Sequence, residues 1–518
     1  MSRHEESRGP CRRLAAAAVT LALVGGIAGC AGDDEGDDTA ATEPPPVTAP
    51  PPPPDETPVR SRELVTRPDL TPPVIEVTTD RSMTPGYLFL APKQARAQTG
   101  PLIVDHAGEV VWSNPRPVTV TDFRVQTYRG EPVLTWWEGD ALGGYGNGDF
   151  VIVDNAYREV ARVQAGDGLE GDQHEFQLTE DGTALILAYP REPADLSDVG
   201  GPAEGYVLDN RVQEVDVETG ELLFDWSALD HSPLTDTYEE LVADAAATAD
   251  RLDDDGSAEA PFDWFHANSV SEGPDGTLLV SARNTHAVYA LDRESGEVRW
   301  QMGGRDPDVV VEDARPFAWQ HDARLLDDGT ISLFDNEADP PVGDASRALV
   351  LDVDVAAGTA AVVRDVTHPE GVLSGSQGNV QVMPGGGLLV GWGSRGRVTE
   401  FSADGQIVYD ATWAPADSYR VFRSEWTGRP PTLPDVATRA ADGGRVEVAA
   451  SWNGATEVAS WRFLAGDGPE ELEAVTTAAR DGFETAAVVD VPPGGSVAAE
   501  ALDADGAVLA RSEPVDAG

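Results

Sequence analysis

Three histidines open three copies of one short sequence phrase. His174 begins HEFQLTEDG, His266 begins HANSVSEGPDG and His321 begins HDARLLDDG. Each phrase ends in an Asp-Gly turn that is followed by an apolar run, which is the pattern of a β-hairpin. An imidazole can transfer protons, bind metals or attack an electrophile near neutral pH. Their equivalent positions in three repeated hairpins make these histidines candidates for one shared site.

A second phrase also recurs along the chain. It is a strand, a turn that often contains Asp or Gly, and a strand that often ends in Trp, and its six copies are LIVDHAGEVVW, FVIVDNAYREVARV, VQEVDVETGELLFDW, VYALDRESGEVRW, LVLDVDVAAGTAAVV and VTEFSADGQIVYDATW. These copies alternate with copies of the first phrase, so each unit has two hairpins and four strands. The pattern predicts an all-β fold with a six-bladed β-propeller over residues 71–429. The start of the first unit, near TPGYLFLAP, is the least clear.

The propeller prediction brings the repeated histidines together. The first strand of each blade lines the central channel, and His174, His266 and His321 each lead such a strand. We therefore expect them at one mouth of the channel. A residue as far after the turn as the histidine is before it lies across the hairpin at the same end. This counting adds Arg283, Tyr189, Asn336, Trp392 and the pair Trp136–Trp137 to the mouth.

These residue types fit an anion better than a metal. Three imidazoles can hold zinc or iron, but Arg283 would repel a cation. Imidazoles and a guanidinium donate hydrogen bonds to a tetrahedral oxyanion, and aromatic walls suit a flat apolar group. Together they suggest an aryl ester of an oxyanion. Two other functions stay open: a non-catalytic propeller that binds a ligand or a protein at the cell surface, and a metal-dependent oxidoreductase.

Four longer strings resemble the bacterial arylsulfotransferase family, in the branch that uses aryl sulfates as donors. The strings are PVLTWWEG, HEFQLTEDGTALI, FHANSVSEGPDGTLLVSARNTHAVYALDRESGEVRWQMGG and WQHDARLLDDGTISLFDN, and the resemblance covers about residues 70–430. It implies a six-bladed propeller that moves a sulfuryl group from a phenolic sulfate ester to a phenol. The implied route is ping-pong through a sulfohistidine, without a cofactor. One departure is Asn284, which stands where many relatives carry a histidine and is followed by His286.

The resemblance also implies roles for individual residues. His321 matches the family's nucleophile, and His174, His266 and Arg283 match its sulfate-binding and transition-state residues. A neutral imidazole can attack sulfur and form a covalent intermediate. The other three groups can stabilise the charged oxygens and the departing phenolate, and His174 or His266 can act as the proton donor.

The N-terminal residues are predicted to direct export and anchoring. In residues 1–30, Arg12 and Arg13 precede the run LAAAAVTLALVGGIAG, which is short for a transmembrane helix and typical of a signal peptide. The run that ends in Cys30 resembles a bacterial lipobox, so Cys30 is expected to be lipidated. Residues 31–70 are rich in proline and acidic residues and are expected to form an unfolded tether. The folded part is then expected on the outer face of the cytoplasmic membrane.

Composition limits the partners of the chain. It has 91 acidic and 36 basic residues and a net charge of -55. Nucleic acid needs a basic surface, so we expect no binding to it. The partners that the resemblance implies are a phenolic sulfate donor and a phenol acceptor.

Two further segments stand apart from the repeats. Residues 227–263 form an insertion, and YEELVADAAATADRL within it predicts a helix in a covering loop or a lid. Residues 430–518 contain alternating strands and Gly/Pro turns, which predict a small Ig-like β-sandwich.

Overall fold

The described part of the chain is nearly all-β, as the sequence predicts. A computed structural model describes residues 60–517 apart from residues 83, 94–97, 242–255, 274 and 314. Strands make up 48% of the described residues. The described residues contain no α-helix, and their short 3-10 turns are η1 (Gly166–Gly168), η2 (Ser197–Val199), η3 (Ala228–Asp230), η4 (Leu234–Asp236), η6 (Gly393–Arg395) and η7 (Asp442–Gly444).

Several sequence predictions fall outside these residues. The predicted leader, the lipidated Cys30, most of the tether and most of the inserted helix lie in the parts that the structure does not describe. Among the described residues, no helix has the length and apolar character needed to cross a membrane.

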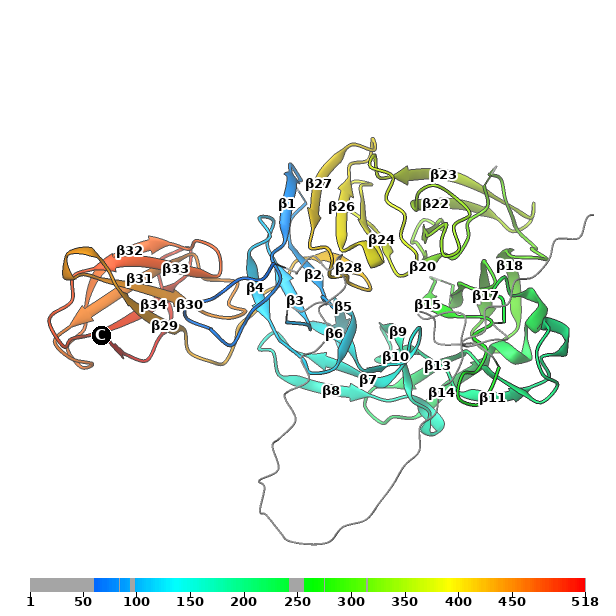
Figure 1. Cartoon of the computed structure of the whole chain (residues 1–518), viewed down its shortest axis with the longest axis horizontal. Helices are drawn as coiled ribbons and strands as arrows, with labels where there is room; N and C mark the ends of the chain where they lie inside the picture. The colour runs from blue at the N-terminus through cyan, green and yellow to red at the C-terminus, as the bar shows by residue number, and fades with distance from the viewer. Residues whose placement is uncertain are drawn as a thin grey trace, which may run out of the picture. The chain divides into compact units, whose positions relative to one another are not determined.

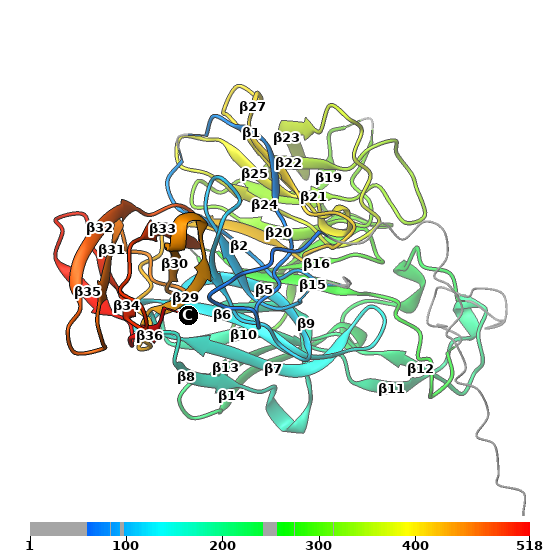
Figure 2. The ribbon, with the colours of Figure 1, turned by 60° about the vertical axis from the view of Figure 1, so that its left-hand side comes forward.

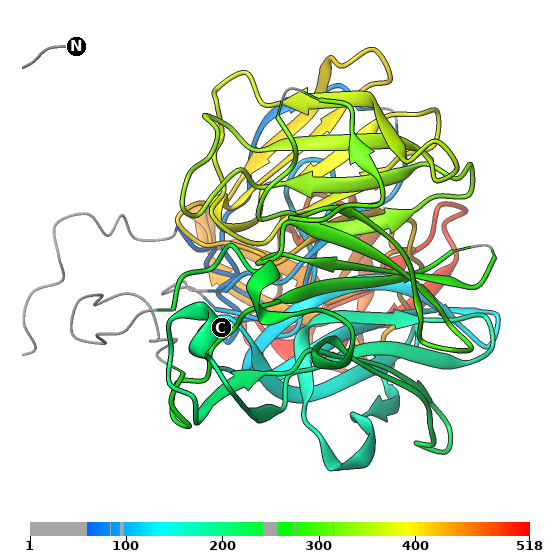
Figure 3. The same cartoon turned by 90° about the vertical axis from the view of Figure 1, so that its right-hand side faces the viewer.

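Antiparallel strands are grouped in fours over most of the chain. The groups are β28 (Val421–Ser424), β2 (Tyr87–Leu90), β3 (Leu102–Val104) and β4 (Val110–Ser113); β5 (Thr119–Tyr128), β6 (Glu131–Ala141), β7 (Gly146–Val153) and β8 (Glu159–Val163); β9 (Gly171–Leu178), β10 (Thr183–Ala188), β13 (Arg211–Asp216) and β14 (Leu222–Ser227); β15 (Ala267–Glu272), β16 (Thr277–Ala282), β17 (Ala287–Asp292) and β18 (Val298–Gly303); β20 (His321–Leu325), β21 (Ile331–Asp335), β22 (Arg347–Asp354) and β23 (Thr359–Thr367); and β24 (Asn379–Val382), β25 (Leu388–Gly391), β26 (Arg397–Phe401) and β27 (Ile407–Thr412). Further strands are β1 (Glu76–Asp80) on β27, β19 (Val310–Val311) on β23, and the pair β11 (Arg191–Ala194) and β12 (Gly205–Leu208). Figure 3 shows the strands from cyan through green to yellow, one sheet after another.

The first strands of the groups face one another around a centre. We call β5, β9, β15, β20, β24 and β28 the inner strands, and Figure 1 labels them around that centre. Polar side chains form hydrogen bonds between neighbouring inner strands. Asn379 in β24 both donates to and accepts from the backbone of Val421 in β28, at 2.9 Å each. Gln126 in β5 accepts the N–H of Leu178 in β9 at 2.8 Å.

The two ends of the repeated region close on each other. β28 pairs with β2. β1 pairs with β27, and Figure 2 labels these two strands side by side. The first group therefore takes its inner strand from residues 421–424, far along the chain. This explains the weak repeat signal near the start of the first unit.

Residues 60–70 pack on the folded part, although the sequence predicts a tether up to residue 70. Leu64 and Leu70 are buried. Thr66 Oγ1 lies 2.7 Å from Ser451 Oγ, and its backbone N–H donates to Glu484 at 2.6 Å. The two leucines supply an apolar contact that the average composition of the segment hides.

Two more sheets follow the repeated region. One contains β29 (Asp435–Ala440), β30 (Val446–Ser451) and β33 (Glu484–Val489), and the other contains β31 (Ser460–Gly466), β32 (Glu473–Ala479), β34 (Ser496–Leu502), β35 (Val508–Arg511) and β36 (Val515–Asp516). Val448, Trp461 and Phe463 belong to one apolar core that both sheets share.

Candidate active site

The three repeated histidines meet at one end of the inner strands. His174 lies in β9, His266 directly precedes β15, and His321 is the first residue of β20. The ring centroids of His174 and His266 are 4.8 Å apart. The ring of Tyr419, just before β28, lies 5.4 Å from that of His174 and 6.4 Å from that of His321. All three histidines are buried, and the structure brings them into one cluster.

A carboxylate orients each of two rings in the cluster. Nδ1 of His174 lies 2.5 Å from Asp172, and Nδ1 of His266 lies 2.5 Å from Asp263. With Nδ1 bonded to a carboxylate, Nε2 is the nitrogen through which each ring can meet a ligand. Burial lowers the pKa of His174, while Asp172 opposes that shift. Each carboxylate would stabilise its ring as an imidazolium when a proton arrives.

His321 is held as a neutral imidazole. Its Nδ1–H donates to Asn336 Oδ1 at 2.8 Å and to the Trp319 carbonyl at 3.1 Å. Its Nε2 accepts the backbone N–H of Gln377 at 3.1 Å. Burial, and then the charge of Arg283, hold the pKa of His321 well below its usual value. The lone pair therefore lies on Nε2, where a nucleophile would need it.

A short loop, residues 374–378, ties these groups together, and we call it the collar loop. Asn336 Nδ2 donates to the carbonyl of Ser374 at 3.1 Å and to that of Gln377 at 3.0 Å. Arg283 Nη2 donates to the carbonyl of Gly375 at 3.4 Å. The side chain of Gln377 donates to Asp417 Oδ2 at 3.1 Å. The loop thus fixes both His321 and Arg283 through main-chain atoms.

Arg283 follows β16 and is held by aromatic and polar partners. Its guanidinium lies over the ring of Trp319 at 4.6 Å, a favourable cation–π distance. Nη1 donates to Asn284 at 2.8 Å and lies 3.8 Å from Glu239 of the insertion. Asn284 in turn donates to the carbonyl of Asp263 at 2.6 Å. The residue that departs from the family pattern therefore connects Arg283 to the segment that orients His266.

His286 supports the site from behind Trp319. Its ring stacks on Tyr238 at 4.1 Å and meets the Trp319 ring edge-on at 4.2 Å. Burial and the nearby charges of Arg283 and Arg305 lower the pKa of His286 to about 3. It is therefore a neutral packing residue and not a fourth member of the cluster.

The structure brings Tyr189 and Asn336 to the cluster, as the hairpin counting predicts. The ring of Tyr189 stacks on that of His174 at 5.7 Å, and its hydroxyl donates to the Ala267 carbonyl. Asn336 bonds to His321 as described above.

The predicted substrate-binding roles of Trp136, Trp137 and Trp392 are corrected by their positions. Trp136 and Trp137 pack in two different apolar cores between neighbouring sheets. Trp392 packs edge-on against Phe334 at 5.8 Å and is fully buried in a third core. These rings stabilise the fold and do not line the cluster.

Several site residues escape the sequence reasoning. Tyr419, Trp319 and Gln377 lie outside the repeated histidine phrases. Asp172 and Asp263 stand two and three residues before their histidines, so the strings DQH and DWFH hold a usable signal. Within the described residues, no three His, Cys, Asp or Glu side chains are placed to share a metal ion.

The cluster offers three kinds of group to a ligand. His321 has a lone pair on a neutral ring. His174 and His266 are rings whose Nδ1 is bonded to a carboxylate, and Arg283 is a fixed cation. A nucleophile, two potential proton donors and a planar guanidinium suit transfer of a tetrahedral oxyanion group.

Comparison with known proteins gives a family match and distant structural similarities. The family model described as Arylsulfotransferase (ASST) matches residues 124–414, which is more than half of the chain. No curated protein matches the chain.

Three solved structures illustrate the structural similarities. A protein of unknown function from Bacteroides caccae is 15% identical over 65% of this chain and 98% of its own, with a TM-score of 0.39. Virginiamycin B lyase from Staphylococcus aureus is 8% identical over 73% of this chain and 96% of its own, with a TM-score of 0.33. A protein of unknown function from Dyadobacter fermentans is 14% identical over 74% of this chain and 96% of its own, with a TM-score of 0.35.

Proposed function

The chain belongs to the arylsulfotransferase family, and from that premise we propose that it transfers a sulfuryl group from a phenolic sulfate ester to a phenol through a sulfohistidine at His321. The family supports aryl sulfotransferase activity on small phenolic substrates in general. The protonation and hydrogen bonding of His321 support the proposed sulfohistidine. His321 is a neutral ring whose Nδ1–H is bonded to Asn336, so Nε2 carries the lone pair that attacks sulfur.

In the first half-reaction, His321 Nε2 attacks the sulfur of the donor. An N–S bond forms, and the S–O bond to the aryl group breaks. The electron pair leaves on the phenolate oxygen, which takes a proton from Nε2–H of His174 or His266. Arg283 donates to the charged sulfuryl oxygens.

In the second half-reaction, a phenol occupies the place of the departed product. The histidine that gave the proton now takes the proton of the phenol, and the phenolate oxygen attacks sulfur. The N–S bond breaks, and its electron pair returns to His321 Nε2. Between the two steps the sulfated ring carries a positive charge, and Asn336 Oδ1 and the Trp319 carbonyl accept its Nδ1–H.

The hydrogen bond from the Gln377 N–H to His321 Nε2 has to break before the attack. A lone pair that accepts a hydrogen bond at 3.1 Å cannot also bond to sulfur. The displaced N–H then lies beside the incoming group and can donate to a sulfuryl oxygen. The collar loop has a glycine on either side of Ser376 and Gln377, at Gly375 and Gly378, which eases this small movement.

We also propose a finer architecture and a location. The inner strands each begin a group of four antiparallel strands, and β28 closes on β2, which supports a six-bladed propeller. The shared core of β29–β36 supports a small β-sandwich. The lipobox-like sequence before Cys30 supports a lipid anchor on the outer face of the cytoplasmic membrane.

Sulfate transfer from 4-nitrophenyl sulfate to a panel of phenols tests the activity. We expect release of nitrophenol that depends on the added phenol, together with a new aryl sulfate, and both should be lost in His321→Ala. The ratio of aryl sulfate to inorganic sulfate measures transfer against hydrolysis. No release with any phenol would favour the non-catalytic ligand-binding propeller. Metal analysis of the purified protein separates the metal-dependent oxidoreductase.

A further inference from the structure

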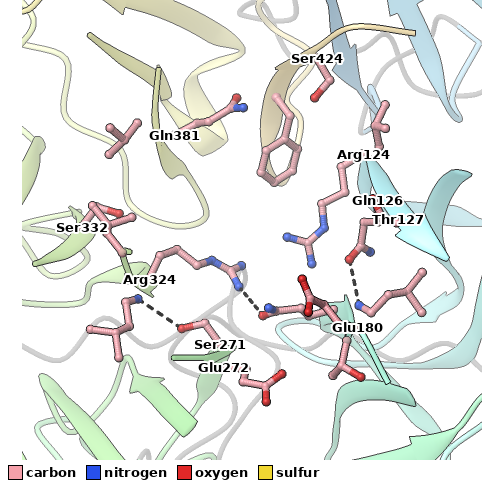
Figure 4. Close-up of a pocket in the computed structure, with 18 of the residues that line it drawn as sticks. Arg124, Gln126, Thr127, Glu180, Ser271, Glu272, Arg324, Ser332, Gln381 and Ser424 are labelled. Atoms are coloured by element: carbon pink, nitrogen blue, oxygen red, sulfur yellow. Dashed lines mark hydrogen bonds between the residues drawn. The ribbon is translucent and has the colours of Figure 1, made fainter. Parts of the chain in front are cut away.

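A pocket opens at the opposite end of the inner strands from the histidine cluster. It has a volume of about 760 Å³, and Figure 4 shows its lining. Its residues lie further along the same strands: Gln177 follows His174 in β9, and Arg324 follows His321 in β20. Three residues of a strand span about 10 Å. The pocket and the cluster therefore lie on opposite sides of the molecule's centre.

A buried ionic cluster separates the two. Arg420 forms ion pairs with Asp122 at 2.8 Å, Glu175 at 3.3 Å and Asp322 at 3.1 Å. The guanidinium of Arg420 lies over the ring of Tyr419 at 4.9 Å, on the side of the histidines. All five side chains are buried. The pocket is thus not a deeper part of the candidate active site.

The floor of the pocket presents cations. Arg124 and Arg324 each donate to Glu175 at 2.6 Å. Their side chains are 12% and 15% exposed, whereas that of Glu175 is fully buried. Figure 4 shows both guanidinium groups pointing into the pocket from opposite walls. The two guanidinium groups therefore face the pocket, while the carboxylates that pair with them lie beneath it.

The walls are mainly apolar, with one buried hydroxyl among them. Ser332 lines the pocket, and its Oγ is buried without a hydrogen-bond partner among the described residues. Phe422 lies beneath the guanidinium of Arg124 at 5.4 Å. The other apolar lining residues are Val125, Leu178, Leu325, Leu326, Val380 and Val382.

The rim adds two carboxylates and an arginine. Glu272 forms an ion pair with Arg293, which does not line the pocket, so the negative charge of Glu272 is neutralised by a residue outside it. Arg129 pairs with Glu218 at 2.5 Å. Glu180 is exposed at the rim. Because its carboxylate would repel an anionic group there, we expect the charge of a ligand to lie at the floor.

We propose that this pocket binds a small organic anion. Its oxyanion head lies on Arg124 and Arg324, since a guanidinium recognises carboxylate, sulfonate or phosphate through paired hydrogen bonds. Its apolar part lies against Phe422 and the aliphatic walls. This binding is independent of the proposed sulfate transfer, because the ionic cluster lies between the two sites.

Calorimetric titration of the folded protein with three matched probes tests the proposal. The probes are 4-iodobenzoate, 4-iodobenzenesulfonate and the neutral 4-iodobenzyl alcohol. We expect saturable binding of at least one anion and binding of the alcohol that is weaker by about tenfold or more. The two anions show which head group is preferred. In soaked crystals, the anomalous signal of iodine should lie between Arg124 and Arg324.

Three outcomes would overturn the proposal. They are equal binding of the alcohol, an iodine signal at the histidine cluster alone, and binding at crystal concentration only. Inactive protein with normal binding of the anion would contradict the proposed sulfate transfer and leave the pocket proposal standing.

A pair of variants at the rim tests the sign of the charge. Val382 lines the pocket and is 39% exposed, so its replacement should not disturb folding. Val382→Glu should weaken binding of the anion by about two- to fivefold, and Val382→Arg should strengthen that binding by a similar factor. Val363→Glu, on β23 and 56% exposed, adds the same charge elsewhere and should change nothing. Equal effects of the two Val382 variants would contradict recognition by charge.

Discussion

Replacing Asp172 by asparagine should reveal whether His174 donates the proton to the leaving phenolate. Asp172 Oδ1 lies 2.5 Å from Nδ1 of His174, and its charge raises the pKa of that ring against the effect of burial. Asparagine keeps the shape and loses the charge, so the pKa of His174 falls further and the imidazolium is lost. A buried hydrogen bond to a charged group contributes about 1.5–3 kcal/mol. In a transition state this corresponds to roughly a 10- to 150-fold loss of rate.

The loss should depend on the leaving group of the donor. 4-Nitrophenolate leaves with little help, whereas unsubstituted phenolate needs a proton. Asp172→Asn should therefore lower kcat/KM for phenyl sulfate by the full factor, and for 4-nitrophenyl sulfate by less than about threefold. Chromatographic measurement of the sulfated product, across a series of aryl sulfates, gives both values.

Asp263→Asn is the matched control, because Asp263 holds His266 at the same 2.5 Å distance. The variant whose rate depends more steeply on the leaving group identifies the proton donor. If both variants lower kcat/KM equally for both donors, or if neither lowers it, the assignment of a carboxylate-supported histidine as the proton donor is refuted.

Two further predictions concern the groups around Trp319. Arg283→Lys keeps the charge but loses the flat guanidinium that stacks on Trp319. We expect kcat/KM to fall by about 10²-fold, with an unchanged circular dichroism spectrum. A loss of kcat/KM below threefold would contradict the proposed role of Arg283. His286→Phe keeps the stack on Tyr238 and removes a ring with a pKa of about 3. An unfolded histidine titrates near pH 6.5, so the unfolded state binds more protons between pH 6.5 and pH 3, and the stability of the folded state falls as the pH drops. Between pH 8 and pH 5, the free energy of unfolding measured by urea titration should fall by about 2 kcal/mol more in the wild type than in the variant. An equal fall in both would count against a neutral buried His286.

The repeated phrases predicted the histidine cluster because they encode position on the inner strands. His174, His266 and His321 occur at the same point of three copies, and equivalent points of neighbouring sheets meet in space. Counting along the hairpins also found Arg283 and Asn336. It did so even though the pairing of β20 and β21 shifts after His321, since both residues lie just beyond the ends of their strands.

The same counting was wrong for the tryptophans because it measures distance along a hairpin and not the face of a strand. Successive residues of a strand point to opposite faces. The second strands are buried on both faces, so Trp136 and Trp137 enter the cores on either side of their sheet.

Tyr419 could not be found from local patterns. It precedes β28, which joins the first sheet only through the closure of the two ends of the repeated region. Its contact with His174 depends on that closure, and no repeat of the histidine phrase marks it.

The bond between sulfur and His321 is the feature on which the proposed function depends. The most direct measurement is mass spectrometry of peptides from protein that was mixed with 4-nitrophenyl sulfate, without a phenol acceptor, and quenched in alkali. We predict a gain of one sulfuryl group on the peptide that contains His321, and loss of that gain when a phenol is added. A burst of nitrophenol without this gain, or a sulfuryl group on the peptide of His174 or His266 instead, would contradict the proposal.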